Sequence, residues 1–275
     1  MSIPLARKRL AIIGAGKIGG ILIQAFLRRK IVPRGNLRVT VRHPERARAI
    51  AERLKVRAGT DNRAAVRGAD IILLAVKPTQ VREVLEEIRA QITSKQMIVS
   101  VAASVPTTYL EEHLPPGVPV VRAMPNTPCA VGAGMTGISK GKHASPAHVA
   151  MAQELFEAVG RTVVVDEKHM DAVTGLSASG PAFLWIVLEA LTDGGVKTGL
   201  PRDVATLLAA QTMNGAARMV LDTGDHPAML KDGVTTPAGC TIDGILELED
   251  GKVRIALIKA VARATQRAKE LLFEG

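Results

Sequence analysis

Residues 9–29 read RLAIIGAGKIGGILIQAFLRR, and this stretch decides the fold. A short apolar run, a turn with glycines and an amphipathic segment follow one another without a break. This order predicts a β-strand that passes through a tight turn into an α-helix. Within the turn, Gly14, Gly16 and Gly19 have the spacing of a dinucleotide-binding motif, with Lys17 and Ile18 between them. The stretch therefore predicts a phosphate-bearing cofactor at the start of the helix.

The three glycines have separate physical tasks in such a motif. Gly14 permits the tight turn, Gly16 lets a pyrophosphate approach the backbone, and Gly19 lets the helix pack closely on the strand. Taken alone, the motif can mark any tight strand-to-helix turn. Here a second strand is expected in NLRVTVR and a second helix in PERARAIAERL, and this strand–helix–strand context makes the dinucleotide interpretation specific.

The alternation of strands and helices continues to about residue 165 and then stops. Further strands are expected in ADIILLAV, MIVSVAA, VPVVRAM and RTVVVDE. This predicts an α/β domain over residues 1–165, built on a doubly wound parallel sheet. Residues 166–275 show helical periodicity only, which predicts an all-helical second domain. Its long apolar faces favour partner helices from another subunit, and a self-contained bundle is the alternative.

Composition and charge narrow the classes of ligand. The chain has 275 residues, 47% of them hydrophobic, with a net charge of +10. Residues 1–165 carry 25 Lys and Arg against 11 Asp and Glu, whereas the remainder carries 11 against 15. The first part therefore favours an anionic ligand, either a phosphate-bearing cofactor or a nucleic acid. With only 2% aromatic residues to stack on bases, the cofactor is the better supported of the two.

Cysteine usage and apolar runs indicate the compartment. Cys129 and Cys240 match neither a metal-binding spacing nor a disulfide framework, so no metal site and a reducing compartment are expected. The N-terminal segment imitates a signal peptide, but Lys17 splits its apolar run and no small-residue cleavage site follows. Uninterrupted apolar runs such as IILLAV are shorter than a membrane span. A cytoplasmic protein that binds neither membranes nor nucleic acid is expected.

The end of the second predicted strand indicates which dinucleotide is used. Proteins that bind NAD usually present Asp or Glu to the ribose there, but VTVRHPER has no carboxylate before Glu45. Arg42 takes this position and predicts a contact with a 2′-phosphate, with His43 and Arg46 as further candidates. NADPH is therefore expected over NADH. The alternative is that these arginines are simply solvated.

Five motifs resemble those of the pyrroline-5-carboxylate reductase family, in that family's order and over nearly the whole chain. They are GAGKIGG, LLAVKPTQ, RAMPNTPCAVGAGMTGIS, SASGPAFLWIVLEALTDGGVKTGLPRD and VTTPAGCTIDGILELEDGKVRIALIKAV. The resemblance implies an N-terminal Rossmann domain, a C-terminal helical dimerisation domain, and a homodimer or a ring of dimers. It also implies reduction of 1-pyrroline-5-carboxylate, a cyclic imine, to L-proline by NADPH or NADH, the last step of proline biosynthesis.

The resemblance further implies which residues contact the cofactor. Ala75, Val76, Lys77 and Pro78 are expected along the ribose and nicotinamide, because open α/β sheets bind ligands at the carboxyl ends of their strands. Asn126 is expected to orient the nicotinamide side. Two alternatives stay open: Lys77 as an ordinary surface lysine, and Asn126 as a residue that bonds the backbone of a turn.

The substrate site is expected in KDGVTTPAGCTIDG, residues 231–244. A helix that begins near Thr241 presents unpaired N–H groups, which suit a carboxylate. By its place in the motif, Thr241 matches the family's threonine that hydrogen-bonds the ring nitrogen, and Thr236 matches a carboxylate contact, with Gly239 and Cys240 completing the turn. Because a threonine hydroxyl is a weak acid, Thr241 is interpreted as a donor or a relay to water. The alternative is that the threonines only cap a helix.

Two departures from the family pattern bear on function. Ala238 stands where the family's usual Ser-Pro-Gly-Gly turn has glycine, and Ala178 stands where glycine is common. The substrate range can therefore differ, and a reductase of another cyclic imine or of a hydroxy acid stays open, as does a cofactor-binding protein without catalysis. A hydroxy-acid enzyme usually needs a helical-domain lysine that neither Lys168 nor Lys231 supplies at the expected spacing. Cys240 has no charged base beside it in the motif, which disfavours a nucleophile.

Overall fold

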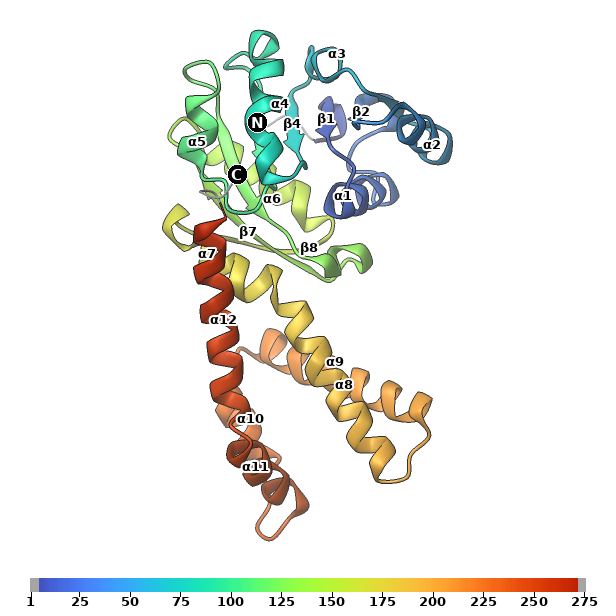
Figure 1. Ribbon diagram of the computed structural model, residues 1–275, viewed down its shortest axis with the longest axis vertical. Coiled ribbons are helices and arrows are strands. Elements are labelled where there is room, and N and C mark those ends of the chain that lie inside the picture. The colour runs from blue at the N-terminus through green and yellow to red at the C-terminus, as the bar shows by residue number, and fades with distance from the viewer. Residues whose placement is uncertain (1–4, 272–275) are drawn as a thin grey trace. The chain divides into compact units, whose positions relative to one another are not determined.

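The computed structural model describes residues 5–271 and divides into two compact units (Figure 1). The first, which we call the sheet unit, runs to Ser179 and includes the chain from Arg263 onward. The second, the helical unit, comprises Gly180–Ala262. The functional boundary that the sequence places after residue 165 stays a prediction.

The sheet unit is built on one eight-stranded sheet in the order β3-β2-β1-β4-β5-β6-β7-β8. Neighbouring strands are parallel except β6 and β7. The order reverses direction between β1 and β4, which is where open α/β sheets place their ligand crevice. The strands are β1 (Leu10–Ile13), β2 (Leu37–Thr40), β3 (Arg57–Gly59), β4 (Ile71–Leu74), β5 (Met97–Ser100), β6 (Val120–Met124), β7 (Gly134–Lys140) and β8 (Gly160–Val164).

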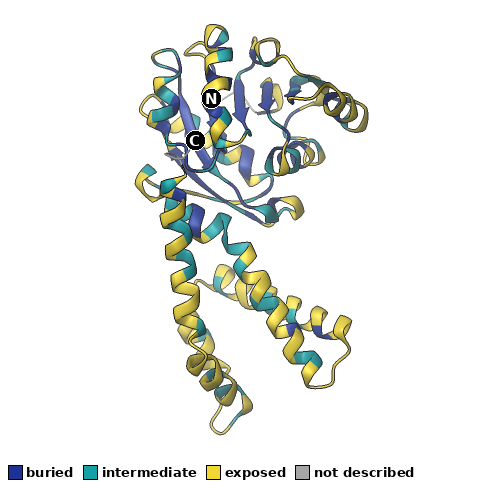
Figure 2. Ribbon diagram, viewed as in Figure 1, coloured by how far each residue is buried: buried dark blue, intermediate teal, exposed yellow. Residues whose placement is uncertain are grey.

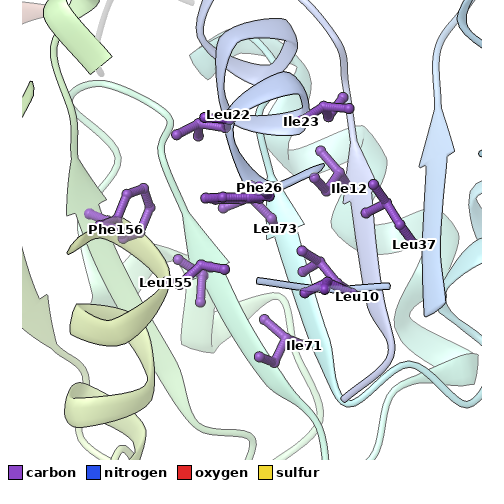
Figure 3. Packing of buried hydrophobic residues seen from close by; sticks show 14 of the residues in the cluster. Leu10, Ile12, Leu22, Ile23, Phe26, Leu37, Ile71, Leu73, Leu155 and Phe156 are labelled. Atoms are coloured by element: carbon purple, nitrogen blue, oxygen red, sulfur yellow. The ribbon is translucent and has the colours of Figure 1, made fainter. Parts of the chain in front are cut away.

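Helices cover both faces of this sheet. One buried cluster joins α1, α2 and α6 to one face, and a second joins α3, α4 and α5 to the other. β4 is buried at every position because alternate side chains enter the two clusters: Ile71 and Leu73 the first, Ile72 and Leu74 the second. Figure 3 shows the first cluster, in which Phe26 lies among side chains from β1, β4 and α6. The helices are α1 (Lys17–Arg28), α2 (Pro44–Leu54), α3 (Asn62–Val66), α4 (Val81–Ile88), α5 (Thr107–Glu112), α6 (Pro146–Glu157) and α7 (Met170–Val173).

Two strands were not expected from the sequence. β3 has three residues, too few for a recognisable alternation. β7 reads GMTGISK, without the apolar run that marks a buried strand, and it is antiparallel to β6. The connection across residues 125–133 contains only the 3₁₀-helical turn Thr127–Val131. A parallel return needs a longer crossover, so this short connection gives the antiparallel pair.

The helical unit contains no strand among its residues, as the sequence predicts. Pro201 and Pro227 lie at the starts of α9 and α10, where the missing N–H is not needed. Only Thr192 and Ala205 of this unit are buried (Figure 2). Its helices are α8 (Gly180–Lys197), α9 (Arg202–Thr223), α10 (Pro227–Gly233), α11 (Cys240–Asp250) and α12 (Val253–Glu270), the last of which runs on into the sheet unit.

One helical stretch within residues 5–271 is long and apolar enough to cross a membrane, judged by length and composition alone. It is Glu167–Lys197, with a mean hydropathy of 1.3 over its 18-residue window, and 17% of that window is buried. Charged residues interrupt its apolar runs, so an inspection of uninterrupted runs misses it. A helix that packs against a second subunit has the same composition, because its apolar face is exposed until the partner is present.

Candidate functional site

The glycine loop has the geometry that its spacing predicts. Gly14 has a φ of +95°, and a Cβ there would lie 2.5 Å from the carbonyl oxygen of Ala75. A Cβ at Gly19 would overlap the carbonyl oxygen of Gly14, so α1 could not approach β1. At Gly16, in contrast, an added Cβ would meet no atom within 4 Å. The loop is therefore tight on the side of the sheet and open over Gly16, which fits the approach of a pyrophosphate.

The open side of the loop faces a cleft of about 370 Å³ at the carboxyl ends of β1, β2 and β4. Gly16 is also the N-cap of α1 and has no side-chain cap, so the first N–H groups of the helix are unsatisfied by side chains. A helix N-terminus of this kind favours an anion. Six of the predicted cofactor residues line the cleft: Gly14, Gly16, Arg42, Ala75, Val76 and Lys77.

Other predicted cofactor residues lie outside the lining of this cleft. Lys17 and Ile18 form the first turn of α1, and Ile18 packs partly against the buried core. Pro78 begins the 3₁₀-helical turn Pro78–Gln80 that precedes α4. Gly19 acts through packing, as described above. Contacts of these residues with a cofactor stay predictions.

The basic residues after β2 differ in their partners. Arg46 donates from Nη2 to the carbonyl oxygen of Ala15 at 3.1 Å and so ties α2 to the glycine loop. Nδ1 of His43 lies 3.7 Å from Oε1 of Glu45. Arg42 is exposed, lines the cleft, and makes no hydrogen bond or ion pair with any residue in the described range 5–271. Its guanidinium is therefore available for an anion at the end of β2.

The structure adds cleft residues that the sequence interpretation missed. Thr60 and Asn62 follow β3, and Gln80 precedes α4. Asn62 donates from Nδ2 to Oε2 of Glu87 at 2.7 Å, which ties the start of α3 to α4. In the sequence, Asp61 could have indicated this helix start, because Asp is a favoured N-cap residue. In the structure its Oδ1 accepts from the backbone N–H of Ala64 at 2.9 Å. It marks a helix start at the carboxyl end of a strand that was too short to recognise.

Asn126 lies two residues after the end of β6, with Pro125 between them, and is 8% exposed. Its Oδ1 accepts from the backbone N–H of Met135 at 2.9 Å, and its Nδ2 donates to the carbonyl oxygen of Ser177 at 3.2 Å. These are bonds to backbone groups, which is the second of the two roles that the sequence left open. A contact between Asn126 and nicotinamide stays a prediction.

The predicted substrate turn lies in the helical unit, just before α11. The backbone N–H of Gly239 donates to the carbonyl oxygen of Thr236 at 3.1 Å, and Ala238 between them has a φ of +54°. This is the pattern of a type II turn, with Pro237 in its second position. A Cβ at Gly239 would overlap Oγ1 of Thr236. Gly239 is therefore required for the Thr236 hydroxyl to lie close to the start of α11.

Neither threonine caps the helix. α11 begins at Cys240. Its N-cap residue is Gly239, which has no side chain, so no side-chain hydrogen bond caps the helix. Within residues 5–271, the hydroxyls of Thr236 and Thr241 make no hydrogen bond, so the capping alternative does not describe this turn. Two unpaired hydroxyls and the free N–H groups of the first helical turn lie in one short segment. This arrangement can hold a carboxylate and a second polar group.

The cysteines occupy different environments. Cys129 is buried, and burial raises the pKa of its thiol above the ordinary value, so it stays protonated at neutral pH. Cys240 is exposed at the first position of α11. No group of three or more His, Cys, Asp and Glu side chains among residues 5–271 is placed to hold a metal ion.

A doubly wound sheet with this glycine loop, cleft and attached helical unit defines a class, that of dinucleotide-dependent oxidoreductases. Two family models match the chain: "NADP oxidoreductase coenzyme F420-dependent" over residues 9–104 and "Pyrroline-5-carboxylate reductase dimerisation" over residues 167–271.

The particular family follows from full-length relatives. The chain is 45% identical to the pyrroline-5-carboxylate reductase of Methanosarcina acetivorans, over 97% of this chain and 99% of that protein, and 39% identical to the one of Arabidopsis thaliana, over 98% of each. Among solved structures, the Coxiella burnetii enzyme is 34% identical, with a TM-score of 0.88 over 96% of this chain and 98% of that one. The Plasmodium falciparum enzyme, solved with NADP bound, is 28% identical with a TM-score of 0.88, over 97% of this chain and 99% of that one. The chain belongs to the pyrroline-5-carboxylate reductase family.

Proposed function

We propose that this protein reduces 1-pyrroline-5-carboxylate to L-proline with NAD(P)H. The observation that carries the proposal is the uncapped start of α11, where the unpaired Thr236 and Thr241 hydroxyls lie beside free N–H groups. An imine with a carboxylate needs one group that fixes the carboxylate and one that bonds the ring nitrogen, and this segment offers both. When bound, NAD(P)H supplies the hydride.

In the cofactor cleft, this chain's residues bind and orient. The first turn of α1 and the open backbone at Gly16 hold the pyrophosphate. Arg42 pairs with the 2′-phosphate of NADPH, since its guanidinium is exposed at the end of β2 and lines the cleft. Ala75, Val76 and Lys77 line the cleft just after β4 and would contact the ribose and nicotinamide. NADPH is accordingly the preferred cofactor.

At the substrate turn, Thr236 and the N–H groups of Cys240 and Thr241 hold the carboxylate. The Thr241 hydroxyl donates to the ring nitrogen or relays a proton to it from water. Hydride addition to the imine carbon would leave the C=N electron pair on nitrogen, and the proton that this nitrogen gains would come from water or the protonated imine, through or beside the Thr241 hydroxyl. Gly239 contributes by leaving room for the Thr236 hydroxyl.

The finer parts of the assignment are proposals as well. We infer that residues 1–165 bind the cofactor and that residues 166–275 bind the substrate and dimerise. The assembly is a homodimer or a ring of dimers, and the compartment is the cytoplasm. Exposed apolar side chains on α8, α9 and α12 support the dimer, because a second copy is the partner that a dimerisation region implies.

NADPH oxidation by the purified protein with pyrroline-5-carboxylate tests the proposal. NADH and a six-membered ring imine run beside it as comparisons. Turnover that prefers the five-membered ring and NADPH is expected. Faster turnover of the six-membered imine would assign a different substrate, consistent with the alanine in the turn. NADPH binding without turnover on any imine would leave a cofactor-binding protein instead.

A further inference from the structure

One side chain in the sheet unit connects three segments that are far apart in sequence. The amide of Asn126 joins the end of β6 to the start of β7 through Met135 and to the π-helical turn Thr174–Ala178 through Ser177. Nδ2 also lies 3.5 Å from Oγ of Ser177. Asn126 is 8% exposed, so its amide has little access to solvent, and both bonds lie in a partly buried environment. Losing either partner would leave a buried polar group unpaired.

The π-helical turn is held on other sides as well. Thr174 donates from Oγ1 to the carbonyl oxygen of Met170 at 2.9 Å, and a Cβ at Gly175 would overlap Oγ1 of Thr265. A Cβ at Gly137 in β7 would lie 2.6 Å from a methyl group of Val173, just before the turn. Close packing therefore fixes the first half of the turn. The bond from Asn126 is the side-chain contact that holds its second half, at Ser177.

The contact between Asn126 and Ser177 lies at the edge of the sheet where the reactive end of a dinucleotide is expected. Asn126 lies at the carboxyl end of β6, on the same edge of the sheet as Ala75 and Lys77 at the end of β4. This edge is where the nicotinamide end of a dinucleotide lies in such sheets. π-helical turns within helices are rare and occur frequently at functional sites. Ser177 is brought to this edge by Asn126 and is partly exposed there.

We propose that Asn126 is a positioning residue that holds the π-helical turn Thr174–Ala178 at the reactive edge of the sheet through the Ser177 carbonyl. The proposal rests on the proposed function for its kinetic consequence. It differs from a direct cofactor contact because Oδ1 and Nδ2 of Asn126 already bond the backbone of Met135 and of Ser177. Loss of the Asn126 donor therefore disturbs the geometry of hydride transfer while cofactor affinity is retained.

Asn126→Asp tests the proposal most directly, because it is isosteric, keeps the acceptor for Met135 and replaces the donor to Ser177 with a second acceptor. We expect kcat to fall by about 10- to 100-fold, the scale of a misplaced reacting geometry, with the dissociation constant for NADPH changed less than about twofold. Asn36→Asp makes the same chemical change at the turn before β2 and serves as the matched control. Should Asn126→Asp not fold, Asn126→Ala removes both amide bonds without adding a charge, and the same measurements apply.

A readout without substrate separates this proposal from the proposed function. Amide hydrogen exchange in the full-length protein should be faster over residues 174–179 in Asn126→Asp than in the wild type, with Met135 still protected. This result would stand even if the wild type proved inactive on pyrroline-5-carboxylate. A large loss of NADPH affinity at unchanged kcat would overturn the proposal in favour of a cofactor contact. If neither the exchange rates nor kcat change, the bonds of Asn126 do not position the turn for the reaction, and the proposal is wrong.

Discussion

The sheet unit and the helical unit bury their apolar residues very differently. In the sheet unit, two clusters of aliphatic side chains fill both faces of the sheet, and β4 is buried at every position. In the helical unit, large apolar side chains such as Trp185, Ile186 and Leu207 are more than half exposed. A helix with apolar residues on several sides needs a partner to bury them. The first unit therefore completes its own core, whereas the second leaves apolar faces exposed that a partner would bury.

The proposed cofactor cleft and the proposed substrate turn also differ in how they are built. The cofactor cleft is rigidly built, since its glycine loop is closed on one side by backbone atoms of Ala75. The substrate turn is an exposed segment with Ala238 in a left-handed conformation, which costs roughly 1 kcal/mol for a residue with a Cβ. The proposed cofactor cleft is held by a core, whereas the proposed substrate site is a short turn at the start of a helix.

Placing a charge on the exposed apolar face of α8 is expected to have the largest effect, because it should prevent the helical unit from associating with a second copy. Ile186→Glu is expected to raise the dimer dissociation constant by more than about 1000-fold and to abolish turnover, because a two-fold interface buries the new charge twice. Sedimentation velocity and NADPH oxidation measure the two effects. Val131→Glu, at the similarly exposed Val131 of the sheet unit, is the matched control for oligomeric state. A stable Ile186→Glu dimer would mean that another face makes the contact.

Removing the Thr241 hydroxyl tests the substrate turn without disturbing the fold. Thr241→Val keeps the shape of the side chain, and we expect turnover to fall by about 10- to 1000-fold, the scale of one lost polar contact to the developing charge. Steady-state kinetics with saturating NADPH measures it, and NADPH binding, which we propose for the sheet unit, should be unchanged. Wild-type turnover in this variant would remove Thr241 from the mechanism.

Removing the Arg42 charge tests the cofactor cleft alone. Arg42→Ala should lower kcat/KM with NADPH by about 10- to 100-fold, the worth of a charge-assisted bond to phosphate, and leave kcat/KM with NADH nearly unchanged. Arg48→Ala removes the same charge from an exposed position of α2 outside the cleft lining and serves as the control. An undiminished preference for NADPH in Arg42→Ala would assign the 2′-phosphate to another residue.

The smallest effect concerns the stability of the sheet unit at mildly acid pH. Nδ1 of His148 accepts from the backbone N–H of Ser145 at 3.0 Å at the start of α6, and burial followed by the charge of Lys8 lowers the pKa of His148 below its ordinary value. Because the folded pKa is the lower one, this stabilisation is present above the unfolded pKa of about 6.5 and is lost as the pH falls toward the folded pKa.

His148→Gln keeps an acceptor in the same helix position but does not titrate. The wild type should lose stability between pH 7 and 5 and the variant should lose less; the difference should be small, because His148 is only partly buried and solvent screens its charge. Thermal unfolding at a fixed protein concentration measures the difference, since association of subunits would make Tm depend on concentration. Parallel pH profiles for the two proteins would assign the acid sensitivity to other groups.

Much of the fold could be predicted because its signals are local. Continuous apolar runs marked β1 and β4, glycine spacing marked the turn before α1, and Pro44 marked the start of α2. Each pattern reflects the steric preference of a few neighbouring residues. The same holds for the helical unit, whose periodicity ran without interruption through α8 and α9. The pattern also indicated that these apolar faces exceed what one copy can bury.

The site was predicted less completely, because its contacts join residues far apart in the chain. The spacing of Gly14 and Gly16 and the place of Arg42 after a strand were readable locally. Thr60 and Asn62 were missed because β3 is only three residues long.

Residue type and motif alone determined the family, the cofactor class and the candidate threonines of this protein. Only the tertiary structure decided that β7 runs antiparallel, because that direction depends on the length of the connection from β6 and not on the strand's own residues. It also decided the partners of Asn126, since an amide can bond a cofactor or a backbone equally well. The reason is the same in both cases: which groups meet is settled by the packing of distant segments, and no local pattern records it.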